Sequence, residues 1–151
     1  MSTLDNLIEA FYDNFVAYYK SHASHVNVVG RNFLSDHELL GKVYEDLQGE
    51  IDTLGELLRT IKVEMPHTLS TIIDGSDILD YMGEGDDEGL DYLRGVYDDV
   101  EMLIEIHLEL EDAAGNSREY NHLANYAQDR VKTLQKFCWM LRSTIDGRDV
   151  Y

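Results

Sequence analysis

The apolar residues of this 151-residue chain recur at steps of three and four, the spacing that places side chains on one face of an α-helix. Ser2 and Thr3 form a cap that predicts the start of the first helix. The stripe of this helix comprises Leu4, Leu7, Ile8, Phe11, Phe15, Tyr18, His22 and His25. Because His22 and His25 continue an apolar stripe, we expect both histidines to face inward.

A second helix is predicted after a break at Gly30. Ser35 and Glu38 have the spacing of a capping box, which marks a helix start. The periodic pattern continues to about Glu64, and Pro66 then stops the helix because proline lacks the backbone donor that a helix requires. The inward stripe of this helix comprises Leu40, Tyr44, Leu47, Ile51, Leu54, Leu58 and Ile61.

The second half of the chain predicts one short and two long helices. The letters "TLSTII" followed by "DG" indicate a short helix over residues 68–73, lying across the outer face of the second and third long helices. Long helices are expected over about 88–114 and 118–145. Their inward positions are Leu90, Leu93, Tyr97, Val100, Leu103, Ile104, His107 and Leu108 in the first, and Leu123, Tyr126, Ala127, Val131, Leu134, Phe137, Cys138 and Leu141 in the second. The expected fold is all-α: a four-helix bundle of ferritin-like connectivity, with a short extra helix in the crossover between helices two and three.

Composition adds a strong negative charge to this picture. Thirty acidic and twelve basic residues give a net charge of −18. Such a surface repels the phosphate backbone, so direct DNA binding is not expected. The charge fits three alternatives, which are simple solubility, attraction of cations, and imitation of DNA.

Length and cysteine content restrict the fold and the compartment. A chain of this length fits one domain, expected over residues 1–151. It contains no apolar run near 18 residues and no signal-peptide pattern, so we expect a cytoplasmic protein without a membrane segment. Cys138 is the only cysteine, which excludes an intrachain disulfide and zinc sites built on paired cysteines.

Two Glu-x-x-His patterns resemble the inward iron-binding motif of many di-iron bundles. The pair Glu64 and His67 straddles Pro66, which prevents the helical geometry that the motif needs. The pair Glu119 and His122 stands in the opening turn of its helix, where glutamate is favoured by the helix dipole. Both matches are interpreted as accidental.

A different set of metal-ligating side chains comprises His25, His37, Asp52 and Glu56. The two histidines flank one hairpin turn, and the two carboxylates lie one turn apart on one helix face, so each pair can converge on one ion. His37 and Asp52, however, are separated by about 22 Å along one helix. If all four residues serve one site, two subunits must pack with their second helices antiparallel, which creates two symmetric sites per dimer.

These residues and their surroundings resemble the Dps family of small ferritin-like proteins. The resemblance extends from Phe15 to Ile145, and its specific parts are "HVNVVGRNFLSDHELLGKVYEDLQGEIDTLGELLRTI" and "KFCWMLRSTI". It implies that the four residues form an inter-subunit ferroxidase site that oxidises Fe(II) with hydrogen peroxide or, more slowly, dioxygen. It also implies storage of Fe(III) in a hollow homo-oligomer of twelve subunits, assembled from two-fold dimers. The alternative is an acidic four-helix interaction protein or DNA mimic that has no catalytic activity.

Aromatic residues near the histidines differ from the family pattern. Many family members have tryptophan directly after the first histidine, where this chain has Val26, and Trp139 is its only tryptophan. His22 is interpreted either as a packed histidine or as an auxiliary group that binds iron or protons. The ten tyrosines are mostly core and interface material, and those near the site are candidates to quench radicals.

Overall fold

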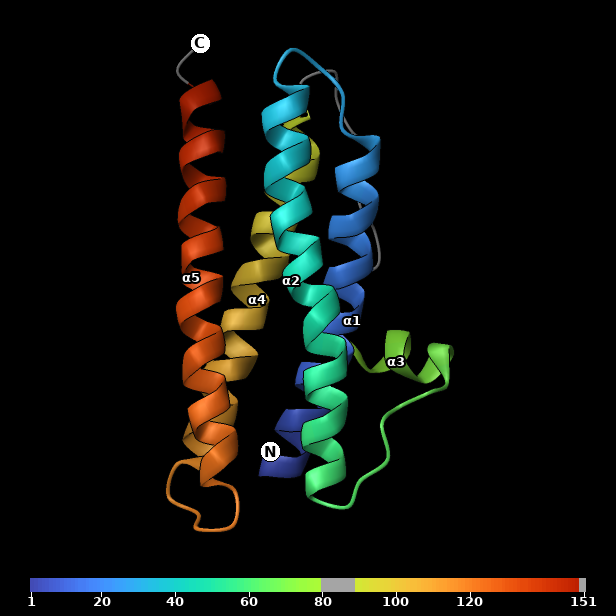
Figure 1. Ribbon diagram of the computed structural model, residues 1–151, viewed down its shortest axis with the longest axis vertical. Helices are drawn as coiled ribbons and strands as arrows, with labels where there is room; N and C mark the ends of the chain where they lie inside the picture. The colour runs from blue at the N-terminus through green and yellow to red at the C-terminus, as the bar shows by residue number, and fades with distance from the viewer. Residues whose placement is uncertain (80–88, 150–151) are drawn as a thin grey trace.

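The computed structural model describes residues 1–79 and 89–149 and contains five helices in that part of the chain. Four long helices run side by side, and a short helix lies outside them (Figure 1). The bounds are α1 Thr3–Asn27, α2 Phe33–Thr60, α3 Leu69–Gly75, α4 Leu90–Ala114 and α5 Asn121–Asp149. The prediction of an all-α four-helix bundle with an extra helix in its crossover is therefore confirmed.

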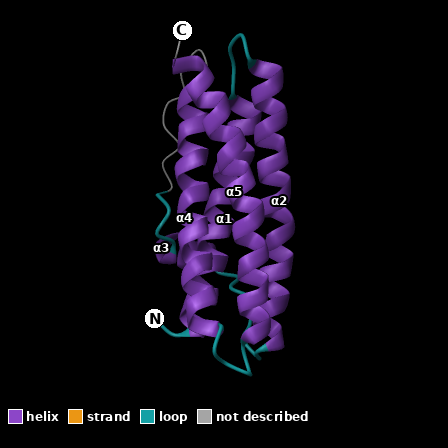
Figure 2. Cartoon of the chain, turned by 90° about the vertical axis from the view of Figure 1, so that its left-hand side faces the viewer, coloured by secondary structure: helices purple, strands orange, loops and turns teal. Residues whose placement is uncertain are grey.

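The first helix begins as the sequence predicts. Ser2 caps α1, since its hydroxyl accepts a hydrogen bond from the Asp5 backbone N–H and the Asp5 side chain accepts one from the Ser2 N–H. This reciprocal capping box satisfies donors that a helix start leaves free. α1 then packs against both α2 and α4 along the bundle, as Figure 2 shows.

Two apolar clusters form the core of the bundle. One gathers residues such as Leu40, Val100 and Leu141, and the other gathers Phe11 and Leu58 with their neighbours; all of these side chains are at most 1% exposed. The buried faces of α2, α4 and α5 match the predicted stripes in most positions. Burial of this apolar surface is the main source of stability for the bundle.

The buried face of α1 differs from its predicted stripe. Only Leu7 and Phe11 of that stripe are buried, and its other six positions, His22 and His25 among them, are half-buried. The reason is that the buried face of α1 is turned toward Asp13 and Ala17.

The start and end of α2 differ from the sequence prediction. Asn32, not Ser35, is the N-cap residue, and the Ser35 hydroxyl donates to the Asn32 carbonyl instead of forming a capping box with Glu38. At the other end, Lys62 adopts a left-handed φ of 68°, which no α-helix can include. The helix therefore stops at Thr60, before the predicted end.

The later helices show smaller differences. α5 starts at Asn121 rather than near residue 118, because the Ser117 hydroxyl accepts from the Tyr120 N–H in a preceding turn. The predicted start of the third long helix at 88 lies outside the described residues. Leu108 was expected inside but is 36% exposed, because its neighbour His107 occupies the inward line of α4. 

The short helix α3 packs on α1, so the prediction that it covers the second and third long helices is wrong. Ile72 of α3 is 2% exposed and joins the core cluster of Phe11. A Cβ atom at Gly75 would lie only 2.5 Å from Cε2 of Tyr12, so glycine permits this close approach.

An acidic cluster attaches the end of α3 to α1. The Ser76 hydroxyl donates to the Asp13 carboxylate at 2.7 Å, and the Asp77 N–H donates to Asp13 at 2.9 Å and to Glu9 at 3.2 Å. Burial and the neighbouring Asp13 raise the pKa of Glu9 to about 8. A proton on Glu9 therefore offsets the repulsion between these carboxyl groups near neutral pH.

No helix in the described part of the chain combines the length and the apolar character that crossing a membrane requires.

Candidate metal centre

His25 and His37 meet where α1 ends and α2 begins. Their rings are stacked, with centroids 3.7 Å apart. Nδ1 of His25 lies 2.6 Å from the His37 carbonyl oxygen, and Nδ1 of His37 lies 2.7 Å from the His25 carbonyl oxygen. A carbonyl can only accept, so each Nδ1 carries the proton and donates. In each neutral ring Nε2 then keeps its lone pair, the form in which histidine binds metals.

Small and aromatic neighbours hold the two rings in place. A Cβ atom at Gly41 would lie 3.0 Å from Cε1 and 3.1 Å from Nδ1 of His25, so glycine leaves the space that this ring occupies. The Tyr44 ring lies 4.9 Å from that of His25, and the Phe33 ring lies 5.1 Å from that of His37. These contacts orient the half-buried histidines without using their Nε2 atoms in any hydrogen bond recorded among the described residues.

Asp52 and Glu56 form the second pair, one turn apart on the exposed face of α2. A hydrogen bond with Asp52 and the charge of that carboxylate raise the pKa of Glu56. No lysine or arginine pairs with either carboxylate among the described residues. The pair is therefore a concentration of negative charge that has no counter-charge within the described part of the chain.

The two pairs do not meet within one chain. His37, Asp52 and Glu56 all belong to the continuous helix α2, on which fifteen residues from His37 to Asp52 span about 22 Å. The only group of three or more metal-ligating side chains that lie together in the described residues is the acidic cluster of Glu9, Asp13 and Asp77. One subunit thus keeps the histidine pair and the carboxylate pair apart.

The Glu-x-x-His patterns do not form sites within the described residues. Glu64 and His67 are exposed in the non-helical connection between α2 and α3. Glu119 precedes the first residue of α5, and both it and His122 are exposed. Neither pair shares an inward helix face, which agrees with the interpretation that these matches are accidental.

The comparisons with known proteins agree with this fold. A family model described as a ferritin-like domain matches residues 4–148. The chain belongs to the ferritin-like family. 

Relatives within the family include Dps proteins, which confirms the resemblance seen in the sequence. The DNA protection during starvation protein of Brevibacillus brevis is 26% identical over 140 residues, which cover 87% of this chain and 86% of that protein. The crystal structure of Helicobacter cinaedi CAIP is 27% identical, with a TM-score of 0.82 over 95% of this chain and 99% of that one. The Dps protein from Vibrio cholerae O1, described as a member of a superfamily of diiron-carboxylate proteins, is 22% identical and shares the fold, with a TM-score of 0.87 over 95% of this chain and 88% of that one.

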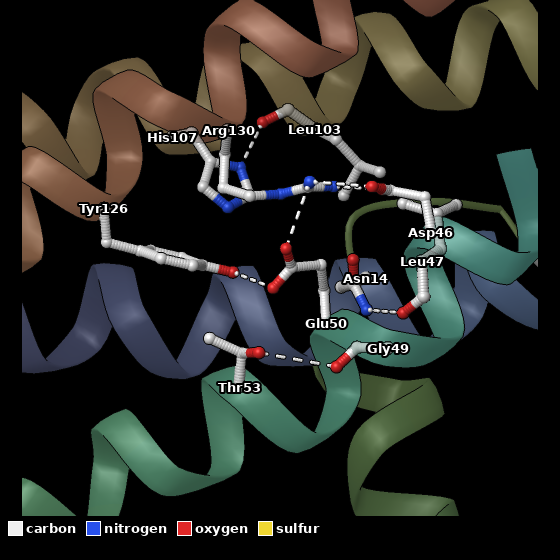
Figure 3. Close-up of polar contacts among 10 residues, drawn as sticks. All are labelled: Asn14, Asp46, Leu47, Gly49, Glu50, Thr53, Leu103, His107, Tyr126 and Arg130. Carbon is white, nitrogen blue, oxygen red and sulfur yellow. Dashed lines mark hydrogen bonds and ion pairs between the residues drawn. The ribbon is translucent and has the colours of Figure 1, made fainter.

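The interior of this ferritin-like bundle holds a polar network that sequence reasoning did not single out (Figure 3). Arg130 of α5 is 4% exposed. It donates to Asp46 of α2 at 2.6 and 3.2 Å and pairs with Glu50, one turn further along α2, at 3.2 Å. Burial alone would lower the pKa of Arg130, but the two carboxylates outweigh it and raise that pKa.

Tyr126 joins this network, and the ring of His107 lies beside it, 6.0 Å from the Tyr126 ring. The Tyr126 hydroxyl donates to Glu50 at 3.0 Å, and burial together with Glu50 raises its pKa. His107 donates from Nδ1 to the Leu103 carbonyl at 2.7 Å, and burial, reinforced by Arg130, lowers its pKa to about 4. In many ferritin-like di-iron proteins the inward carboxylates and histidines of the bundle hold iron. Here a guanidinium group neutralises the inward carboxylates.

Proposed function

We propose that the protein oxidises Fe(II) at sites shared between two subunits and stores the resulting Fe(III) inside a homo-oligomeric cage. The observation that carries this proposal is the reciprocal pair of hydrogen bonds between His25 and His37. Both Nδ1 atoms are used by backbone carbonyls, which leaves both Nε2 atoms available as ligands.

The proposed ligands of Fe(II) are His25 and His37 of one subunit and Asp52 and Glu56 of its partner in a two-fold dimer. Such a dimer packs two α2 helices antiparallel, so that the histidines of each subunit face the carboxylates of the other. A cation between them relieves the repulsion between the Asp52 and Glu56 carboxylates, which adds to their hydrogen bond in raising the pKa of Glu56. Imidazole and carboxylate together suit iron and leave coordination positions open for an oxidant.

Hydrogen peroxide is the proposed preferred oxidant, with dioxygen the slower one. Peroxide accepts two electrons, so two Fe(II) and two protons are consumed for each peroxide and two Fe(III) and two waters are formed. The second iron position of each site is weakly held, because four protein ligands are enough for only one iron.

The proposed assembly is a dodecamer built from two-fold dimers. Exposed apolar side chains beside the histidines, Val26 at 63% and Leu34 at 71% exposed, supply area that a dimer can bury. Twelve chains at −18 each carry 12 × (−18) = −216 formal charges, so bound cations and inter-subunit ion pairs contribute to holding the cage together. The same charge excludes direct DNA binding in this proposal, and we place the protein in the cytoplasm.

The test compares His37→Ala and Asp52→Asn with two control variants, His67→Ala and Glu109→Gln, whose side chains are exposed outside the proposed site. Both site variants should slow peroxide-dependent Fe(II) oxidation sharply while light scattering shows an intact assembly. Both controls should match the wild type. A wild-type protein that leaves the oxidation of free Fe(II) unchanged would instead support a non-catalytic acidic interaction protein.

A further inference from the structure

A chain of ring contacts leads away from His25 into the subunit. The Tyr44 ring lies 4.9 Å from His25 and is stacked on His22, with centroids 4.0 Å apart and planes within 3°. The Tyr18 hydroxyl lies 2.9 Å from Nδ1 of His22. Two half-buried rings, those of Tyr44 and His22, thus connect the proposed iron site to Tyr18, a tyrosine that is hydrogen bonded to a base.

The contact between Tyr18 and His22 has the chemistry of a redox-active tyrosine. Loss of one electron makes a phenol strongly acidic, so a phenol gives up an electron easily only where an acceptor takes its proton. With the neutral His22 proton on Nε2, Nδ1 accepts the hydrogen bond of the Tyr18 hydroxyl and can hold that proton. His22 is thus placed as the proton acceptor for Tyr18.

We propose that Tyr18, with His22 as its proton acceptor and Tyr44 as the bridge to His25, supplies the second electron when peroxide reacts at a site that holds one Fe(II). This inference rests on the proposed ferroxidase function. It assigns to His22 the role of a proton acceptor rather than of a packing residue alone.

The electrons and protons balance within the site. Fe(II) gives one electron to peroxide and Tyr18 gives the other through Tyr44, so the O–O bond breaks and two hydroxide ions form. The phenol proton of Tyr18 moves to Nδ1 of His22, which leaves Fe(III), a neutral tyrosyl radical and a histidinium ion. A second Fe(II) then reduces the radical, and His22 returns the proton to the Tyr18 oxygen. Two Fe(II) are oxidised per peroxide, and no hydroxyl radical is released.

Other oxidisable side chains are less well placed. Tyr19, the next residue along α1, is 63% exposed and has no ring contact with the two histidines among the described residues. Trp139 lies on α5 and is 56% exposed, whereas the ring chain is formed by α1 and α2. Tyr19 therefore serves as a matched control for Tyr18.

The experiment mixes the assembled protein with less than one Fe(II) per site, adds hydrogen peroxide, and records freeze-quenched electron paramagnetic resonance spectra. The wild type and Tyr19→Phe should show a tyrosyl radical. Tyr18→Phe, Tyr44→Phe and His22→Phe should lose most of that signal. In Tyr18→Phe a spin trap should capture several-fold more hydroxyl radical than in the wild type.

The outcomes separate this inference from the proposed function. If the wild type does not accelerate Fe(II) oxidation, the ferroxidase function fails, and the electron relay fails with it. If oxidation is accelerated but the radical signal is equal in Tyr18→Phe and Tyr19→Phe, only the relay is overturned. Ring-deuterated tyrosine in the wild type provides a readout that needs no variant to fold, because an unchanged radical spectrum would also overturn the relay.

Discussion

The helix α2 carries two carboxylate pairs of the same spacing, Asp46 with Glu50 and Asp52 with Glu56. The two pairs differ in burial and in the charge that they face. Six residues separate them, which turns the second pair by about 240° around the helix. The inward pair meets the buried guanidinium of Arg130. The outward pair is exposed, and a hydrogen bond with Asp52 together with the charge of that carboxylate raises the pKa of Glu56.

The difference shows how position on a helix decides the use of one motif. The half-buried inward pair and the buried guanidinium of Arg130 require each other, because an unpaired buried charge is very costly. An exposed pair can remain without one, because water stabilises it until a cation arrives. The inward pair is therefore structural, and the outward pair is the one that we propose to bind iron.

The largest predicted effect comes from neutralising each pair in turn. Asp46→Asn with Glu50→Gln leaves Arg130 buried without a counter-charge and should lower the free energy of unfolding by about 3–5 kcal/mol. Asp52→Asn with Glu56→Gln removes only exposed repulsion and should change it by less than about 0.5 kcal/mol. Urea unfolding at matched protein concentration measures both.

Adding Arg130→Met to the inward double variant should recover much of the lost stability, because the unpaired charge is then removed. Equal destabilisation by the inward and outward double variants would contradict the division between a structural and a binding pair.

A smaller effect is expected at the histidine half-site. Gly41→Ala pushes a methyl group against the His25 ring, which should weaken Fe(II) or Zn(II) binding by about tenfold through misorientation of a ligand. Gly95→Ala on α4 meets no atom within 4 Å and is the matched control. It should leave metal affinity unchanged and stabilise the helix by roughly 0.5–1 kcal/mol. Calorimetric titration measures the affinity, and equal affinities for both variants would show that the space at Gly41 does not position His25.

The smallest effect concerns the acidic cluster of Glu9, Asp13 and Asp77, where a proton on Glu9 offsets the negative charge that Arg130 offsets in the inward pair. The pKa of Glu9 is raised in the folded state from 4.5 to about 8, so the folded protein holds this proton more tightly than the unfolded chain does. The stabilisation that this bound proton gives the folded state is complete below pH 4.5 and is lost as the pH rises through about 8.

Glu9→Gln should remove this dependence and stabilise the protein at pH 9 by about 1 kcal/mol after solvent screening, or roughly 2–4 °C in Tm. Melting curves from pH 5 to 9 compare it with Glu109→Gln, a substitution at an exposed position of α4. Parallel curves for the wild type and Glu9→Gln would contradict the proposed protonation.

The sequence predicts the helices well because their apolar spacing is long and regular. It does not predict the end of α2, where the left-handed backbone of Lys62 stops the helix before Pro66 can. The inward network was also missed, although a signal exists. Arg130 stands between Ala127 and Leu134 in the apolar register of α5, and a charged residue in that register requires an opposite charge on a facing helix.

The residues of the candidate site could be predicted from the sequence, but their hydrogen-bond geometry could not. Residue types and spacing identify His25, His37, Asp52 and Glu56 and show that one chain separates them. The Nδ1 hydrogen bonds of the histidines could not be predicted, because they depend on how closely the ends of α1 and α2 approach. The assignment of the four residues to one shared site stays a prediction.

The most direct test of this shared site is subunit complementation. One variant lacks the histidines, His25→Ala with His37→Ala, and the other lacks the carboxylates, Asp52→Asn with Glu56→Gln. Each should be inactive alone in Fe(II) oxidation. Random 1:1 mixing makes about half of the dimers hybrid. In each hybrid, one of the two sites combines the intact histidines of one subunit with the intact carboxylates of the other, and the second site lacks both pairs. The co-assembled protein should therefore regain about a quarter of wild-type activity. No recovery in verified hybrids, or full activity of either variant alone, would contradict a site built from two subunits.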